Sequence, residues 1–196
     1  MKKVIQELQL MYEEAGVPLK SIHIGGDEVA EGAWQGSPIC KDFMLEYSMT
    51  DVQELSDYFI MRIVDFLKEQ KIPFSGWQEV VLGHNEISER YLTDNAFGIS
   101  CWRTSANNHS DELIYKFANK GYPVIYLDLA YDAHPDEPGH NWNGYVDESK
   151  SFALLPYCIY RSIRTHLLAN QKQEEKTSLT AEGRKNIKGV ESALWS

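Results

Sequence analysis

Residues 21–29 read SIHIGGDEV, and the way this stretch is built sets the fold that we expect for the chain. It begins with a short β-branched run, continues into two glycines, and reaches two adjacent carboxylates, Asp27 and Glu28. Neighbouring side chains on a strand point to opposite faces, so both acids can serve one site only where the strand is ending. The stretch therefore predicts a strand whose carboxyl end carries an acid pair, Asp27 with Glu28.

Helical and strand patterns alternate about five times along the chain. Apolar residues at helical spacing predict helices over residues 4–15, 52–70, 86–91, 110–119 and 158–169. Short apolar runs predict strands over residues 21–24, 72–77, 96–100, 123–127 and 189–194. A capping box of Thr50 and Gln53 predicts the start of the second helix. Because such alternation is typical of parallel βα units, we expect residues 1–196 to form a single α/β domain.

Acidic and aromatic side chains gather where the predicted strands stop. They are Asp27 with Glu28, then Trp77, Trp102, Tyr126 with Asp128, and Trp195. In a parallel α/β barrel the active site is assembled from the carboxyl ends of several strands. Core packing favours Leu, Ile and Val, and a buried indole needs a partner for its N–H. A wall of indoles beside carboxylates suits a sugar instead, whose ring stacks on them and whose hydroxyls bond to the acids.

The composition narrows the classes of partner. With 43% hydrophobic and 24% charged residues, the chain is an ordinary globular one. Its net charge of −10 argues against nucleic acid and anionic membranes as partners. No stretch approaches the ~20 apolar residues of a membrane-spanning helix. Three scattered cysteines and the absence of H-x-x-x-H spacing favour free thiols and no metal, so we expect no cofactor.

Several motifs, in the same order, resemble glycoside hydrolase family 20, the β-N-acetylhexosaminidases. HIGGDE at 23–28 is close to that family's signature on barrel strand four. Further resemblances follow in order: Trp34 with Pro38, GWQE at 76–79, CWR at 101–103, YLD at 126–128, EPG at 137–139 with Trp142, and the segment 189–196. The resemblance covers nearly the whole chain, and an ordered set of motifs is far more specific than one.

The resemblance implies a role for each member of the acid pair. Glu28 would protonate the departing glycosidic oxygen and then activate water as a base. Asp27 would hold the 2-acetamido group of the substrate and stabilise the positive charge that develops on it. The acetamido oxygen attacks the anomeric carbon in this retaining, substrate-assisted scheme, which differs from the usual two-carboxylate mechanism. No metal is required.

The resemblance also implies a set of substrate-binding residues. Tyr126 would bond the acetamido oxygen, and Asp128 would bond sugar hydroxyls. Tryptophans would line the pocket: Trp77, Trp102, Trp195 and, in a neighbouring part, Trp142. His23 has two interpretations, either a hydrogen-bonded histidine of the barrel interior or a residue that supports the acid pair.

The resemblance begins just before the family's strand four and stops inside strand eight. We therefore expect a partial (β/α)8 TIM barrel, with about five parallel strands (family strands four to eight) and flanking helices. The family's arginine on strand one and its histidine on strand three have no counterpart here. We expect these 196 residues alone to hydrolyse terminal non-reducing N-acetylhexosamine residues of glycans weakly or not at all. Exposed barrel edges would favour a homo-oligomer.

Two alternatives stay open at this stage. The chain could be a non-catalytic, sugar-binding remnant of such a barrel, with the same tryptophans and no turnover. It could also be an unrelated barrel hydrolase with an Asp-Glu pair and no preference for a 2-acetamido group. Sugar preference, linkage and compartment are open too. The start of the chain shows no signal-peptide pattern, and a periplasmic or secreted parent enzyme is compatible with the resemblance.

Overall fold

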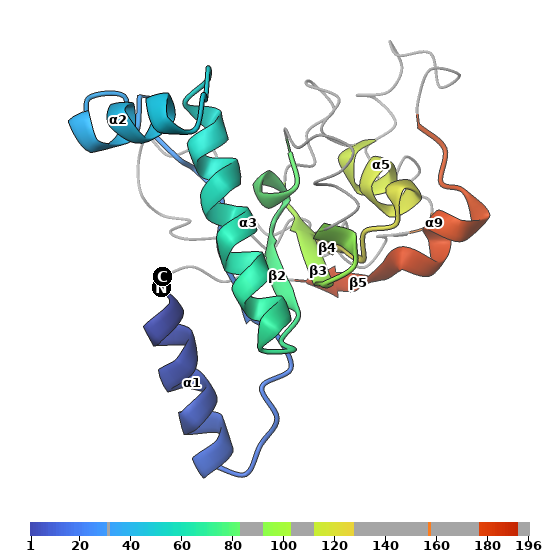
Figure 1. Ribbon diagram of the computed structural model, residues 1–196. Coiled ribbons are helices and arrows are strands. Elements are labelled where there is room, and N and C mark those ends of the chain that lie inside the picture. Colours follow the sequence, from blue (N-terminus) through green and yellow to red (C-terminus); the bar gives the residue numbers. More distant parts are fainter. Residues whose placement is uncertain (31, 83–91, 103–111, 128–156, 158–176, 192–196) are drawn as a thin grey trace, which may run out of the picture. The chain divides into compact units, whose positions relative to one another are not determined.

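A computed structural model describes residues 1–30, 32–82, 92–102, 112–127, 157 and 177–191 (Figure 1). The chain divides into two compact units, Met1–Phe97 and Gly98–Ser196. Within each unit, short parallel strands run beside helices. The predicted helices at 86–91 and 158–169 lie outside the described residues.

The first unit holds two parallel strands and the longest described helices. In chain order its elements are α1 (Lys2–Glu14), β1 (Ile22–His23), α2 (Pro38–Glu46), α3 (Gln53–Glu69), β2 (Phe74–Trp77) and the 3-10 turn η1 (Gln78–Val80). β1 pairs with β2 in parallel, with Ile22 opposite Phe74 and His23 opposite Ser75. The predicted strand–helix–strand order of this part is thereby confirmed.

The core of the first unit forms on one face of α3. Its buried residues are Ile60, Ile63, Val64, Phe66 and Leu67, which recur at helical spacing. Phe74 on β2 and Val80 after it are fully buried, as is Ile5 of α1 at 1% exposure. Burial of each such side chain contributes roughly 1.5–3 kcal/mol. The helix is therefore stabilised by its apolar stripe, as the sequence predicts.

The second unit carries three parallel strands. Its described elements are β3 (Ala96–Cys101), which begins at the end of the first unit, then α5 (Leu113–Lys120), β4 (Val124–Leu127), α9 (Ala181–Asn186) and β5 (Ile187–Glu191). β3 pairs with β4 and β4 with β5, both in parallel. Gly121 ends α5 with a left-handed φ of 100°, as a glycine in this place predicts.

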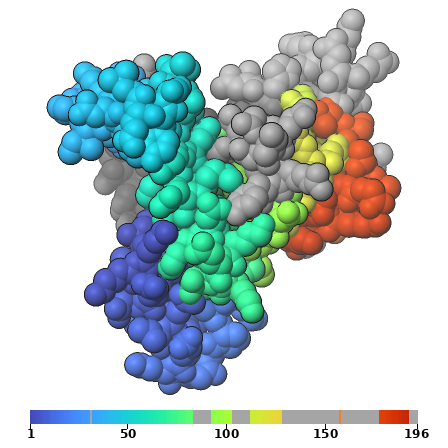
Figure 2. Space-filling model, viewed as in Figure 1, coloured from blue at the N-terminus to red at the C-terminus, as the bar shows by residue number. Residues whose placement is uncertain are grey.

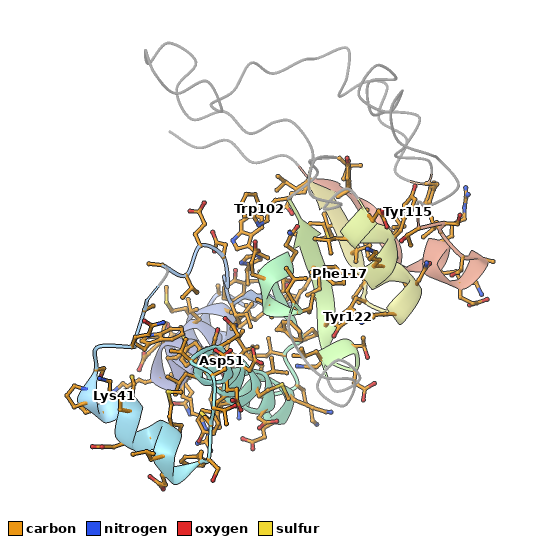
Figure 3. The ribbon with its side chains drawn as sticks, turned by 90° about the horizontal axis from the view of Figure 1, so that it is seen from above. Lys41, Asp51, Trp102, Tyr115, Phe117 and Tyr122 are labelled. Carbon is orange, nitrogen blue, oxygen red and sulfur yellow. The ribbon has the colours of Figure 1, made fainter. Side chains whose placement is uncertain are left out.

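Aromatic side chains contribute to the core of the second unit. Phe117 of α5 and Tyr122 lie edge to face, with ring centroids 5.9 Å apart. Tyr115 of α5 is buried as well, and Figure 3 labels Tyr115, Phe117 and Tyr122. Tyr122 is completely buried at the turn that leads from α5 into β4. Aromatic packing thus joins this helix to the strand that follows it.

Three details of the sequence prediction were incomplete or wrong. The helices α2 and α9 were not predicted, and β5 begins at Ile187 rather than at residue 189. α2, light blue in Figure 2, has no buried residue. Nevertheless Ser37 caps it and Pro38 opens it, and that pair is a helix-start signal.

The predicted capping box of Thr50 and Gln53 is wrong in its second member. α3 begins at Gln53 with Val52 as its N-cap residue, so the side chain that reaches back is that of Glu54. Its Oε1 accepts hydrogen bonds from the backbone N of Thr50 at 2.7 Å and of Asp51 at 2.9 Å. These bonds lower the pKa of the Glu54 carboxyl, with the bond from Asp51 contributing most.

Candidate functional site

The acid pair follows an abrupt change of direction at the end of β1. The strand stops at His23, and Gly25 and Gly26 have left-handed φ values of 74° and 106°. Glu28 also has a positive φ, 48°, which is rare for a residue other than glycine. Strained backbone of this kind is concentrated at functional sites. The turn ends the alternation of a strand, so the two adjacent carboxylates are no longer forced to opposite faces.

Both members of the acid pair are exposed, and the backbone before them is fixed by β2. The N–H of Ile24 donates to the carbonyl of Ser75 at 2.8 Å. The N–H of Trp77 donates to the carbonyl of Gly25 at 3.0 Å. These bonds extend the parallel pairing of β1 and β2 beyond His23. The carboxylates therefore project from a turn whose base is held by an ordered strand.

His23 and Trp77 lie together at the base of this turn. Their rings meet edge to face, with centroids 4.9 Å apart and an interplanar angle of 72°. The N–H of Gly25 donates to Nδ1 of His23 at 3.2 Å, so Nδ1 acts as an acceptor in this contact. This contact ties His23 to the turn that leads to the acid pair, and both interpretations of its role stay predictions. The first unit thus brings together His23, Trp77 and the acid-pair turn.

The second unit holds two further residues of the predicted site. Trp102 directly follows β3 and is half-buried, and Figure 3 labels it. Tyr126 lies on β4, only 2% exposed, with Cys101 as its register partner. Register partners on parallel strands share a face, so Tyr126 and Cys101 lie on one side of this sheet and Ser100 and Ile125 on the other.

Ser100 makes a contact that the sequence did not predict. Its hydroxyl donates to Oε2 of Glu191 at 2.8 Å, which ties β3 to β5 across β4. Ser100 is 3% exposed and stands two residues before Trp102. Ser100 could have been selected from the sequence as the residue two before the predicted pocket residue Trp102, because side chains two apart on a strand share a face.

Three predicted site residues, Asp128, Trp142 and Trp195, lie outside the described residues. In the part of the chain that the structure describes, no group of three or more His, Cys, Asp or Glu residues could hold a metal ion. Nor does any helix within that part have the length and apolar character needed to cross a membrane.

Comparison with known proteins identifies one family over the entire chain. The family described as "Glycosyl hydrolase family 20, catalytic domain" matches residues 1–196. A beta-hexosaminidase of Vibrio vulnificus is 30% identical over 206 residues, covering 100% of this chain and 24% of that protein. A beta-hexosaminidase B of Pseudoalteromonas piscicida is 32% identical, covering 79% of this chain and 20% of that protein. The chain thus spans about a quarter of the length of these relatives or less.

A solved structure supports the same relationship. The GH20 exo beta-N-acetylglucosaminidase of Vibrio harveyi, in complex with N-acetylglucosamine, aligns with a TM-score of 0.67 at 26% identity. The alignment covers 99% of this chain and 26% of that one. With the five described strands, each paired in parallel within its unit, this confirms the predicted fold class, a part of the family's barrel.

Proposed function

The chain belongs to glycosyl hydrolase family 20, and on that premise we propose that it takes part in removing terminal N-acetylhexosamine residues from glycans. We further propose that residues 1–196 act as one domain of a catalytic barrel. The observation that carries the proposal is the turn after β1, where two exposed carboxylates follow strained backbone held against Trp77. The names of the relatives, hexosaminidases and a chitobiase, support the same substrate class.

In the proposed reaction Glu28 is the acid and then the base. Its carboxyl proton passes to the glycosidic oxygen as the bond from that oxygen to the anomeric carbon breaks. The acetamido oxygen of the substrate attacks the same carbon and forms a cyclic intermediate. The Glu28 carboxylate next accepts a proton from the water that opens this intermediate. Two inversions at one carbon give overall retention of configuration.

Asp27 stabilises the positive charge that develops on the acetamido group. A carboxylate next to that group lowers the energy of the intermediate because opposite charges attract. Trp77 provides an apolar face next to the turn, against which the sugar packs. For Trp102 and Tyr126, pocket roles remain predictions, as they do for Asp128, Trp142 and Trp195.

Hydrolysis of two p-nitrophenyl β-glycosides by the purified chain at high enzyme concentration tests the proposal. We expect at most slow cleavage of the 2-acetamido sugar and none of the matching glucoside, which has a 2-hydroxyl group. The Glu28→Gln variant is the control, and we expect it to cleave the 2-acetamido sugar more slowly because its general acid and base is lost. Equal cleavage of the two glycosides would favour an unrelated hydrolase.

The second candidate function is sugar binding without turnover. Affinity for N-acetylglucosamine with no detectable hydrolysis would favour this candidate. Hydrolysis at rates usual for the family, abolished in Glu28→Gln, would overturn our prediction that the 196 residues are weak or inactive alone.

Pairing with a second copy of the chain is also a proposal. Strand edges offer unpaired backbone groups that a further strand can bond. Light scattering tests it directly, since a monodisperse monomer would count against a homo-oligomer.

A further inference from the structure

We propose that Val80 is a positioning residue for the acid pair. Its side chain fills the space that Gly26 and Gly76 leave open, and it thereby holds the turn before Asp27 against the end of β2. The catalytic consequence of this packing rests on the proposed function, whereas the packing itself can be measured without it.

Two glycines from different segments face one valine. A Cβ atom added at Gly26 would overlap Cγ2 of Val80. A Cβ atom at Gly76 would lie 2.6 Å from the same Cγ2 and 3.3 Å from Cβ of Val80. Real Cβ atoms essentially never come as close as 2.6 Å to another heavy atom. Only glycine at both positions therefore lets Val80 sit where it does.

Val80 is fully buried at the end of η1, which directly follows β2. The same two segments are joined by the hydrogen bond from the N–H of Trp77 to the carbonyl of Gly25. That carbonyl oxygen would lie 3.2 Å from a Cβ at Gly76, so there is little room on this side either. Packing by Val80 and the Trp77 hydrogen bond hold the turn together.

The position of this turn decides where the carboxylates lie. Gly26 directly precedes Asp27, and its φ of 106° sets the direction in which the chain leaves β1. A shift of Gly26 away from β2 would carry both carboxylates with it. A displacement of about 1 Å at a catalytic group can cost on the order of 100-fold in rate.

A double-mutant cycle on Gly76 and Val80 tests the inference. Gly76→Ala forces a methyl group against Cγ2 of Val80, and Val80→Ala removes that carbon. In Gly76→Ala we expect the Trp77 amide, whose N–H donates to Gly25, to exchange with solvent at least about tenfold faster. In the double variant the close contact at 2.6 Å is gone but the packing by Val80 is lost too, so exchange should be slower than in Gly76→Ala and still faster than in the wild type. The two substitutions should thus compensate rather than add.

Gly36→Ala is the matched control. Gly36 belongs to the same unit, and nothing lies within 4 Å of a Cβ placed there. We expect its Trp77 amide exchange and its turnover to equal those of the wild type. Unchanged exchange in Gly76→Ala, or a double variant that exchanges faster than either single variant, would overturn the inference.

Kinetics on the same variants separate this inference from the proposed function. In an active chain, kcat for the N-acetylglucosaminide should fall in Gly76→Ala and recover in the double variant, in step with Trp77 amide exchange. A fall in kcat that the double variant does not reverse would contradict positioning by Val80. A wild-type chain that neither binds N-acetylglucosamine nor hydrolyses the N-acetylglucosaminide would contradict the proposed function. The amide-exchange measurements would then still test whether Val80 packs against the two glycines.

Discussion

Replacement of Asn119 by alanine tests how the second unit holds its last described helix and strand. The Nδ2 group of Asn119 donates to the carbonyl of Ser178 at 2.9 Å. Its Oδ1 accepts from the backbone N of Thr180 at 2.9 Å and from the Thr180 hydroxyl at 3.0 Å. The Thr180 hydroxyl in turn accepts from the N–H of Gly183 at 2.9 Å and caps α9. One side chain at the end of α5 thus organises the start of α9.

The expected cost follows from the number of bonds and their exposure. Each hydrogen bond contributes roughly 0.5–1.5 kcal/mol, so three would contribute about 1.5–4.5 kcal/mol. Asn119 is half-buried, and water replaces part of what is lost, so we expect a loss of about 2 kcal/mol in the free energy of unfolding. For a chain of this size, that corresponds to a melting temperature lower by roughly 4–8 °C.

Calorimetry on Asn119→Ala and Asn119→Asp provides the assay and its control. Aspartate keeps both acceptor contacts to Thr180, but it loses the donor to Ser178 and sets a carboxylate oxygen against that carbonyl, so we expect it to recover at most part of the stability lost in alanine. A loss below about 0.5 kcal/mol in Asn119→Ala, the range of an ordinary surface substitution, would refute the reasoning.

Two further predictions concern side chains outside the acid pair. Because the folded pKa of Glu54 is depressed below its ordinary value of 4.5, its contribution to stability is complete above that value and is lost as pH falls through the folded pKa. Urea midpoints near neutral pH and at about pH 3 should therefore differ more in the wild type than in Glu54→Gln, and equal differences would contradict this. Glu191→Ala should cost about 1 kcal/mol or more, because it removes the acceptor of the buried Ser100 hydroxyl. Ser100→Ala should cost less, since the exposed Glu191 turns to water, and equal losses by chemical denaturation would count against the asymmetry.

The sequence predicts those elements whose signal is local. α3 buries a regular apolar face, and Gly121 stands where α5 needs a left-handed residue. α9 escaped prediction because its six residues are mostly polar and its start depends on Asn119, which is 61 residues away from Thr180. β5 begins early because Ile187 pairs with Val124, a contact that no local pattern encodes.

In the candidate site, too, the sequence predicts features with a local pattern and misses contacts that depend on the fold. The acid pair could be located from the sequence, since two glycines and two carboxylates after a β-branched run form a distinctive local pattern. The contact of His23 with Trp77 could not, because it depends on the register of β1 against β2. The sequence did not indicate Val80, because a buried valine is common. Its proposed role depends on two glycines, Gly26 and Gly76, that come close to it only in the folded chain.

The leaving-group dependence of Glu28→Gln tests most directly whether Glu28 is the acid of a family-20 hydrolase. N,N'-diacetylchitobiose releases a sugar alkoxide that needs a proton, whereas p-nitrophenolate departs more readily without one. We therefore predict a kcat/KM loss of roughly 10²–10⁴-fold on the disaccharide and a clearly smaller loss on the p-nitrophenyl N-acetylglucosaminide. Asp27→Asn should slow both substrates alike, because the acetamido charge develops with either leaving group. Equal losses on the two substrates in Glu28→Gln would contradict the assignment of Glu28 as the proton donor.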